Sequence, residues 1–308
     1  MDKRILKKII DDCPLTNYSE TGNVKDREKQ LLSYLKEKTN YLYKNQADII
    51  KSFWEENFAE SQVLIIQQSA YLQRSFIFFD VVVTIYNEIN TKYIKNRKST
   101  KTADVLSVQI KNTFSIFKSM ITLAMNGCFH SVLAEYRIMY ESFVITKYLL
   151  LHPELIPIYY DHAKFLALHI NEVSNNNTTE QKMQYDDYIA KYGKEFTEEL
   201  GWTASIIKDF HKRKPKTLAK ECNLEAMFEP MYRVSCNYVH ASSLAATSQI
   251  SPNFVIPFIN VCIYMIDYEM VDFINECKVV KKEAVILKNL IEFIIDDLFK
   301  DFEKKEFF

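Results

Sequence analysis

Apolar residues recur along this chain at the three- and four-residue spacing of amphipathic α-helices, and no segment shows the alternation typical of β-strands. A break or cap interrupts the pattern roughly every 20 to 30 residues, which is a common helix length. The pattern predicts helices over about 24–60, 61–94, 103–126, 128–152 and 153–173, shorter helices and turns over 178–228, a helix begun by Pro230, and two last helices at 254–277 and 280–304.

Three of the predicted helix boundaries have specific local chemistry. Asn126-Gly127 is a pair that favours a left-handed helix cap. His152 is followed by Pro153, and a proline disfavours helical backbone in the residue before it. The polar stretch "SNNNTTE" supplies hydroxyl and amide side chains that cap the start of a following helix.

Composition supports the helical prediction. The 308 residues include only four glycines and seven prolines, while 48% are hydrophobic. A chain with so few turn-forming residues consists mostly of long helices with short connections. We therefore expect an all-α protein, a helical bundle with an N-terminal helical extension. The polar stretch "KNRKSTKTAD" (95–104) divides it into an N-terminal region, 1–99, and a C-terminal bundle, 100–308.

Charge, cysteine spacing and hydropathy limit the partners. Lys and Arg number 39 against 40 Asp and Glu, so any basic binding surface must be local. The six cysteines form no Cys-x-x-Cys pair, and we expect neither a metal site nor a cofactor. The N-terminus lacks the apolar run of a signal peptide. The longest apolar run, starting at Phe254, is shorter than the roughly 18 residues of a membrane span. These features predict a cytoplasmic protein without membrane contact.

The segment "CFHSVLAEYRIMYESFVITKYLLLH" (128–152) is apolar almost all the way round, as expected of a helix inside a bundle. Arg137 and Glu141 are four residues apart and therefore adjacent on the helix surface, and His130 shares that face. Two interpretations stay open. The pair either fixes packing as a buried ion pair, whose net stabilisation is small, or belongs to a functional site.

The stretch "MYRVSCNYVHASS" (231–243) carries a second constellation. Seven residues are almost two helical turns, so Arg233, Cys236 and His240 fall on nearly one face. Arginine can stabilise a phosphate and histidine can move a proton, which are the two tasks of metal-free phosphodiester cleavage. The neighbouring Tyr232 and Asn237 are candidate substrate contacts. The alternative is that His240 bonds a neighbouring helix while Arg233 faces solvent.

The segment "KDFHKRKPKTLAK" (208–220) holds six Lys or Arg against one Asp. Such a local cluster is either a solvated loop or a contact for the phosphates of a nucleic acid. The substrate-binding candidates within it are Lys212, Arg213, Lys214 and Lys216.

Several chemistries lack their sequence patterns. No Glu-x-x-His pair suited to a di-iron bundle occurs, and no glycine-rich phosphate loop is present. The Gly-x-Ser-x-Gly turn of α/β-hydrolases is also missing.

The segment "NGCFHSVLAEYRIMYES" resembles the first signature block of a bacterial helical family of unknown function, family 5677, and "KPKTLAKECNLEAMFEPMYRVSCNYVHAS" resembles its second block. The resemblance covers about 105–275. Where the family pattern has a serine four residues before the histidine, this chain has Cys236, with Ser235 beside it. The positions that match the family pattern are Gly127, Ser131, Arg137, Glu141, Tyr232 and His240.

More loosely, Arg233 and His240 with six residues between them resemble the Arg-x4–6-His motif of the HEPN superfamily of helical proteins. Members of that superfamily include metal-independent ribonucleases of toxin and anti-phage systems, with the motif helix at a dimer interface. In those enzymes a polar residue usually follows the arginine, whereas Val234 does here.

The resemblance implies a metal-independent endoribonuclease or RNA-binding effector, in which His240 is the general acid or base and Arg233 stabilises the phosphate. Arg137 and Glu141 would orient this site. The implied partners are RNA, a second copy of the chain through the helix around 230–241, or another protein. The alternative is a non-catalytic helical module for interaction or ligand sensing.

Overall fold

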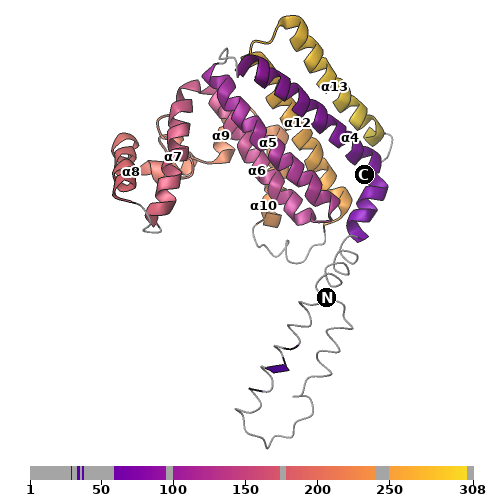
Figure 1. Cartoon of the computed structure of the whole chain (residues 1–308), viewed down its shortest axis with the longest axis horizontal. Helices are drawn as coiled ribbons and strands as arrows, with labels where there is room; N and C mark the ends of the chain where they lie inside the picture. The colour runs from indigo at the N-terminus through magenta and orange to yellow at the C-terminus, as the bar shows by residue number, and fades with distance from the viewer. Residues whose placement is uncertain are drawn as a thin grey trace, which may run out of the picture. The chain divides into compact units, whose positions relative to one another are not determined.

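The computed structural model describes residues 59–94, 100–173, 178–239 and 250–303, together with a few isolated positions between 29 and 37. Nine α-helices and no strand occur among these residues, which confirms the all-α prediction. The predicted helix over 24–60 falls largely outside them. The helices, labelled as in Figure 1, are α4 (Ala59–Ile89), α5 (Lys101–Met125), α6 (Phe129–Leu151), α7 (Ile156–Val173), α8 (Thr179–Tyr192), α9 (Pro215–Glu221), α10 (Glu225–Val239), α12 (Pro252–Glu276) and α13 (Lys281–Glu303).

The three predicted boundary signals are confirmed. Gly127, after the end of α5, has a φ of 71°, a left-handed conformation that glycine adopts without steric cost. Helix α6 ends at Leu151, and Pro153 begins the short 3₁₀ turn η3 (Pro153–Leu155). Thr178 caps α8 through a capping box with Gln181, in which each side chain accepts a hydrogen bond from the other residue's backbone N–H.

The prediction that Pro230 begins a helix is wrong. Helix α10 starts five residues earlier, at Glu225, and Pro230 lies inside it. A proline inside a helix removes one backbone hydrogen bond and crowds the preceding turn. Here it stands in the second turn, where a backbone N–H would otherwise donate to the carbonyl of Ala226, so one hydrogen bond near the start of α10 is lost. Helix α10 also packs along α6, and tertiary packing of this kind overrides local propensity.

The described residues from 68 to 124 and from 128 to 303 form one compact unit, and residues 59–67 with 125–127 belong to a second. Within the first unit, α4 packs on the bundle helices. The Phe79 ring lies 5.7 Å from that of Phe114 in α5, and the Tyr86 ring lies 5.3 Å from that of Phe273 in α12. The second half of α4 therefore packs within the bundle unit, and the domain boundary near residue 99 stays a prediction.

Helices α6 and α12 form the centre of the bundle. Helix α6 contacts α9, α10 and α12, and its buried residues cover nearly its whole circumference, from Phe129 and Tyr136 to Phe143 and Leu149. Helix α12 is long and apolar enough to cross a membrane by length and composition, with a window of mean hydropathy 1.5. More than half of that window is buried inside the structure. Fully burying an aliphatic or aromatic side chain stabilises a fold by about 1.5 to 3 kcal/mol, so this packing accounts for its apolar composition.

Helices α7 and α8 pack on each other and on the turns that follow them, η4 (Lys194–Thr197) and η5 (Gly201–Thr203). His162 of α7 is buried there, and its Nε2 lies 3.1 Å from the Phe196 carbonyl oxygen and 2.9 Å from that of Glu198. Burial lowers the pKa of His162, although the two carbonyls act in the opposite direction. This histidine therefore serves as a donor that ties η4 to α7.

A carboxyl group lies inside the bundle without a well-formed hydrogen bond. Glu269 of α12 is 1% exposed, and neither of its carboxyl oxygens has a hydrogen-bond partner. The hydroxyls of Thr113 and Thr146 lie near it, while the ammonium of Lys147 pairs with Asp272. Burial raises the pKa of Glu269 from 4.5 to about 7, and the two hydroxyls and Lys147 limit the rise. A buried carboxyl of this kind is tolerated because it can bind a proton.

Replacing Glu269 by glutamine should stabilise the protein at pH 8 and leave its stability at pH 5 nearly unchanged. Because the pKa of Glu269 is raised in the folded state, its contribution to stability is fully present below about pH 4.5 and is lost as the pH rises through about 7. The loss amounts to roughly 3 kcal/mol. Thermal unfolding followed by circular dichroism at pH 5 and pH 8 measures it.

The matched control is Glu88→Gln, because Glu88 is exposed on α4. This variant should follow the pH dependence of the wild type. Equal pH dependence in Glu269→Gln and wild type would show that Glu269 does not titrate inside the fold.

Candidate functional site at the contact of α6 and α10

The predicted Arg137 and Glu141 pair is formed on α6. Arg137 Nε donates a hydrogen bond of 2.9 Å to Glu141 Oε1, and the two side chains are 25% and 23% exposed. Burial acts to lower the pKa of Arg137, but its hydrogen bond to Glu141 and the charge of that carboxylate raise it on balance. The pair is therefore neither sealed in the core nor fully solvated, and a ligand can reach it from the surface.

Tyr232 of α10 joins the pair from 91 residues further along the chain. Its hydroxyl donates to the same Glu141 Oε1 at 2.6 Å, a length typical of a charge-assisted hydrogen bond. Its ring lies 4.7 Å from the ring of buried Tyr140, and the Arg137 guanidinium lies 5.7 Å from its centre. Burial and the neighbouring Glu141 raise the pKa of Tyr232, so its phenol remains a hydrogen-bond donor at neutral pH. We call Arg137, Glu141 and Tyr232 the polar triad.

The remaining candidates on α10 are divided between its two sides. Arg233 and Asn237 are exposed, whereas Cys236 is half-buried and close enough to affect the pKa values of Arg137 and Tyr232. Ser235 is fully buried, and its hydroxyl donates to the Tyr232 carbonyl at 2.7 Å. That hydroxyl is therefore used within the helix and does not replace the serine of the family pattern.

His240 lies outside the described residues, so the pairing of Arg233 with His240 stays a prediction. The described part of α10 approaches α6 again near its end. The His130 ring of α6 lies 5.9 Å from the ring of Tyr238, and Tyr238 in turn lies 5.6 Å from Phe254 of α12. The contact between α6 and α10 thus continues to within two residues of His240.

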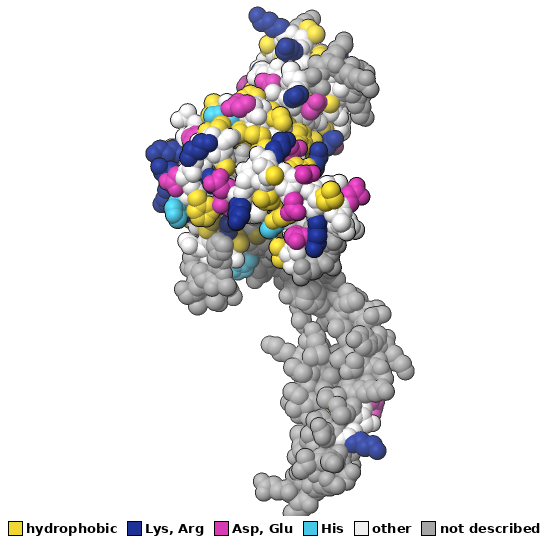
Figure 2. Space-filling model, turned by 90° about the vertical axis from the view of Figure 1, so that its left-hand side faces the viewer, with side chains coloured by type: hydrophobic (Ala, Val, Ile, Leu, Met, Phe, Trp, Pro, Cys, Tyr) yellow, Lys and Arg dark blue, Asp and Glu magenta, His cyan; other side chains and the backbone are white. Residues whose placement is uncertain are grey.

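The basic segment lies beside the two helices of the triad. Helix α9 contacts both α6 and α10, and Lys216 at its start pairs at 3.6 Å with Glu225 in the first turn of α10. Lys212 and Lys214 are exposed, and Lys212 lies 3.6 Å from Asp209. Figure 2 shows basic, acidic and hydrophobic side chains interspersed over the displayed face, which agrees with a net charge of −1.

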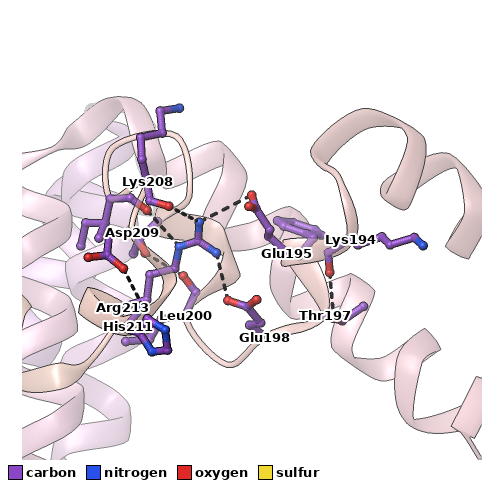
Figure 3. Close-up of polar contacts among 12 residues, drawn as sticks. Lys194, Glu195, Thr197, Glu198, Leu200, Lys208, Asp209, His211 and Arg213 are labelled. Carbon is purple, nitrogen blue, oxygen red and sulfur yellow. Dashed lines mark hydrogen bonds and ion pairs between the residues drawn. The ribbon is translucent and has the colours of Figure 1, made fainter.

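Arg213 differs from the lysines around it because its side chain is only 2% exposed. Its Nε donates to the Ile207 carbonyl at 2.9 Å, and its Nη1 donates to Glu198 Oε2 at 2.9 Å. Glu195 lies 3.5 Å from Nη2, which also donates to the Lys208 carbonyl. Figure 3 shows the guanidinium between the two glutamates. Arg213 was predicted to contact a substrate, but the structure places it under the loop surface, where it holds the backbone.

Sequence reasoning named the members of the triad but missed what joins them. Tyr140 supports the Tyr232 ring from within α6, and in the sequence it is indistinguishable from the other apolar residues of that helix. The hydrogen bond between Tyr232 and Glu141 joins separate helices, so no local spacing predicts it. Among the described residues no group of three or more His, Cys, Asp or Glu side chains could hold a metal ion.

Comparison with known families supports the first resemblance. Residues 103–253 match the model of a protein family described as "Family of unknown function (DUF5677)". The match includes most of α5 and all of α6 to α10, and therefore the whole polar triad. No significant match was found among curated proteins or among solved structures. The looser HEPN resemblance stays a prediction.

A double-mutant cycle should reveal energetic coupling between α6 and α10 through the triad. Tyr232→Phe removes the hydroxyl and keeps the ring on Tyr140, and Glu141→Gln removes the charge that accepts the bond. We expect each single variant to lose about 1 to 2 kcal/mol of unfolding free energy, and the double variant to lose clearly less than the sum. Urea unfolding at pH 7 measures these values. Additive losses would mean that the 2.6 Å contact contributes nothing to stability.

Proposed function

We propose that the α6–α10 contact is the active site of a HEPN-like, metal-independent endoribonuclease, an RNA-targeting effector of a bacterial toxin or anti-phage system. The observation that carries the proposal is the hydrogen bond between Tyr232 and Glu141. It brings together the two sequence segments on which the resemblance to family 5677 rests, and the second of these segments also carries the HEPN-like motif. Because these segments are far apart in the chain, their convergence on one partly exposed polar cluster supports a shared function.

Each residue has a chemical role in this proposal. His240 acts as general base toward the ribose 2′-hydroxyl or as general acid toward the 5′-oxygen. The 2′-oxygen attacks phosphorus, the bond to the 5′-oxygen breaks, and a 2′,3′-cyclic phosphate forms. Arg233 stabilises the negative charge that develops on the phosphate oxygens, since a guanidinium keeps its charge at every physiological pH.

The polar triad orients α10 against α6 in this proposal. Glu141 accepts hydrogen bonds from both Arg137 and Tyr232 at one oxygen, which fixes the register of α10 next to Arg233. Positioning of this kind contributes to rate because small displacements of a reacting group are costly. The exposed lysines of the neighbouring segment would contact the phosphates of the RNA.

The proposal includes a second copy of the chain and a cytoplasmic location without membrane contact. Val234 is 37% exposed on α10, and it lies within about 100° of exposed Arg233 and Asn237 around the helix. An outer helix side of this mixed composition supports docking of an identical helix, which would bring two Arg233 and His240 pairs close together. A different partner protein on the same side is the alternative.

One observation favours a second candidate function, a non-catalytic module for interaction or ligand sensing. The Arg137 guanidinium already contacts the Glu141 carboxylate and the Tyr232 ring. A polar cluster that satisfies its own members can serve packing register alone.

Purified protein should cleave mixed cellular RNA in excess chelator, and His240→Ala and Arg233→Ala should each slow cleavage about 100-fold or more, since loss of a general acid–base or of a phosphate-stabilising group has effects of that order. The readout is the rate of product formation on denaturing gels, with circular dichroism to confirm folding. His169→Ala on α7 is the control for loss of a histidine elsewhere and should cleave at the wild-type rate. Cleavage by His240→Ala at the wild-type rate would overturn the role given to His240, and no cleavage by the wild type would favour the non-catalytic module.

A further inference from the structure

The 3₁₀ turn η6 (Phe210–Lys212) presents an aromatic ring among lysines. Phe210 is 55% exposed, although it is one of the largest apolar side chains. Exposed Lys208 precedes it, and exposed Lys212 and Lys214 follow it. Single exposed apolar residues are common on protein surfaces, so exposure alone indicates nothing. The backbone of this turn, however, is held in place by several hydrogen bonds.

Arg213 fixes the backbone on both sides of Phe210. Its guanidinium binds the carbonyls of Ile207 and Lys208, which precede the ring, while its own backbone follows directly after η6. Asp209 caps the turn by accepting the His211 N–H at 3.0 Å. Burying a guanidinium is costly unless charges and hydrogen bonds compensate, and Arg213 has two glutamates and two carbonyls for this purpose. The chain thus holds rigidly a turn whose outward side chains are largely exposed.

The charges around Phe210 favour an anionic partner. Glu195 and Glu198 compensate Arg213, which leaves the three lysines against the single carboxylate of Asp209. The contact between Lys212 and Asp209 is solvent-exposed at 3.6 Å, and an exposed pair of this kind contributes little to stability. A phosphate can therefore take the place of the Asp209 carboxylate as the partner of Lys212 at little cost in free energy. Figure 3 shows Lys208 directed away from the Arg213 cluster, toward the surface.

We propose that the η6 turn is a docking surface for single-stranded RNA, on which Phe210 stacks an unpaired base and Lys208, Lys212 and Lys214 contact the flanking phosphates. This proposal rests on the RNA-directed function proposed above and names the strand form of the substrate. Proteins that bind single strands combine a basic track with aromatic rings on which bases stack. Double-stranded RNA keeps its bases inside the helix, so it offers no ring to Phe210.

The ring and the lysines predict different experimental signatures. Stacking involves no counterions, whereas each phosphate contact adds about 0.7 to the slope of log affinity against log salt for a single strand. Phe210→Leu should weaken binding about tenfold without changing that slope, and Phe210→Tyr should restore binding. Lys214→Ala should reduce the slope by about 0.7. Lys194→Ala is the control, because Lys194 is exposed on η4 and points away from Arg213 in Figure 3.

The experiment is fluorescence anisotropy of a labelled single-stranded RNA with the full chain in chelator, over a series of salt concentrations. A duplex of the same length is the second probe and should bind more weakly. Equal affinity of Phe210→Leu and wild type for the single strand would overturn the proposal, as would the absence of any RNA binding. RNA cleavage that is lost in His240→Ala but unchanged in Phe210→Leu and Lys214→Ala would leave the proposed function standing and reject this docking surface alone.

Discussion

A helix that is buried on nearly every side can carry charged residues only where its neighbours supply partners for them. Helix α6 is in this position, and it carries Arg137, Glu141 and Lys147 between large buried aromatic side chains. Lys147 finds its partner in Asp272 of α12, and Glu141 binds Tyr232 of α10. The charges of α6 therefore determine which faces of α10 and α12 can pack against it, and the packing of both helices depends on these contacts.

Two buried ionisable residues, Arg213 and Glu269, have different surroundings in the bundle. The buried guanidinium of Arg213 is compensated by two glutamates and by backbone carbonyls, and through these contacts it holds a loop. Neither carboxyl oxygen of Glu269 accepts a well-formed hydrogen bond, and this carboxyl is best accommodated as a neutral acid near Thr113 and Thr146. Compensation thus produces a loop whose backbone is held in place from below. Missing compensation makes the packing of α12 dependent on protonation.

The sequence predicted most of the fold because helix periodicity and caps are local properties. The ends of α5 and α6 and the start of α8 follow from Gly127, Pro153 and Thr178, each of which acts within one turn. Pro230 misled the prediction because its local preference for a helix start was outweighed by the packing of α10 on α6. Local patterns describe backbone preferences, and they describe contacts between distant helices only poorly.

The candidate site shows the same division between local and distant information. The spacing of Arg137 and Glu141 predicted their contact, whereas the bond to Tyr232 required the three-dimensional structure. Composition likewise placed Arg213 among lysines of equal charge, although its burial gives it a different role. A planar guanidinium can bind two carboxylates and two carbonyls at once, which an ammonium group cannot do with the same geometry.

Helix α9 connects the loop that Arg213 holds to the polar triad. It begins at Pro215, two residues after Arg213, and packs on both α6 and α10. Lys216 of α9 then pairs with Glu225 in the first turn of α10. Helix α10 has fifteen residues, and Tyr232 is one of them. The continuous segment from Arg213 to Tyr232 is therefore anchored at both ends. The contacts of Arg213 hold one end, and the hydrogen bond from Tyr232 to Glu141 holds the other. A ligand that spans the η6 turn and the exposed side of α10 would meet two anchored surfaces, and such preorganisation lowers the entropy lost on binding.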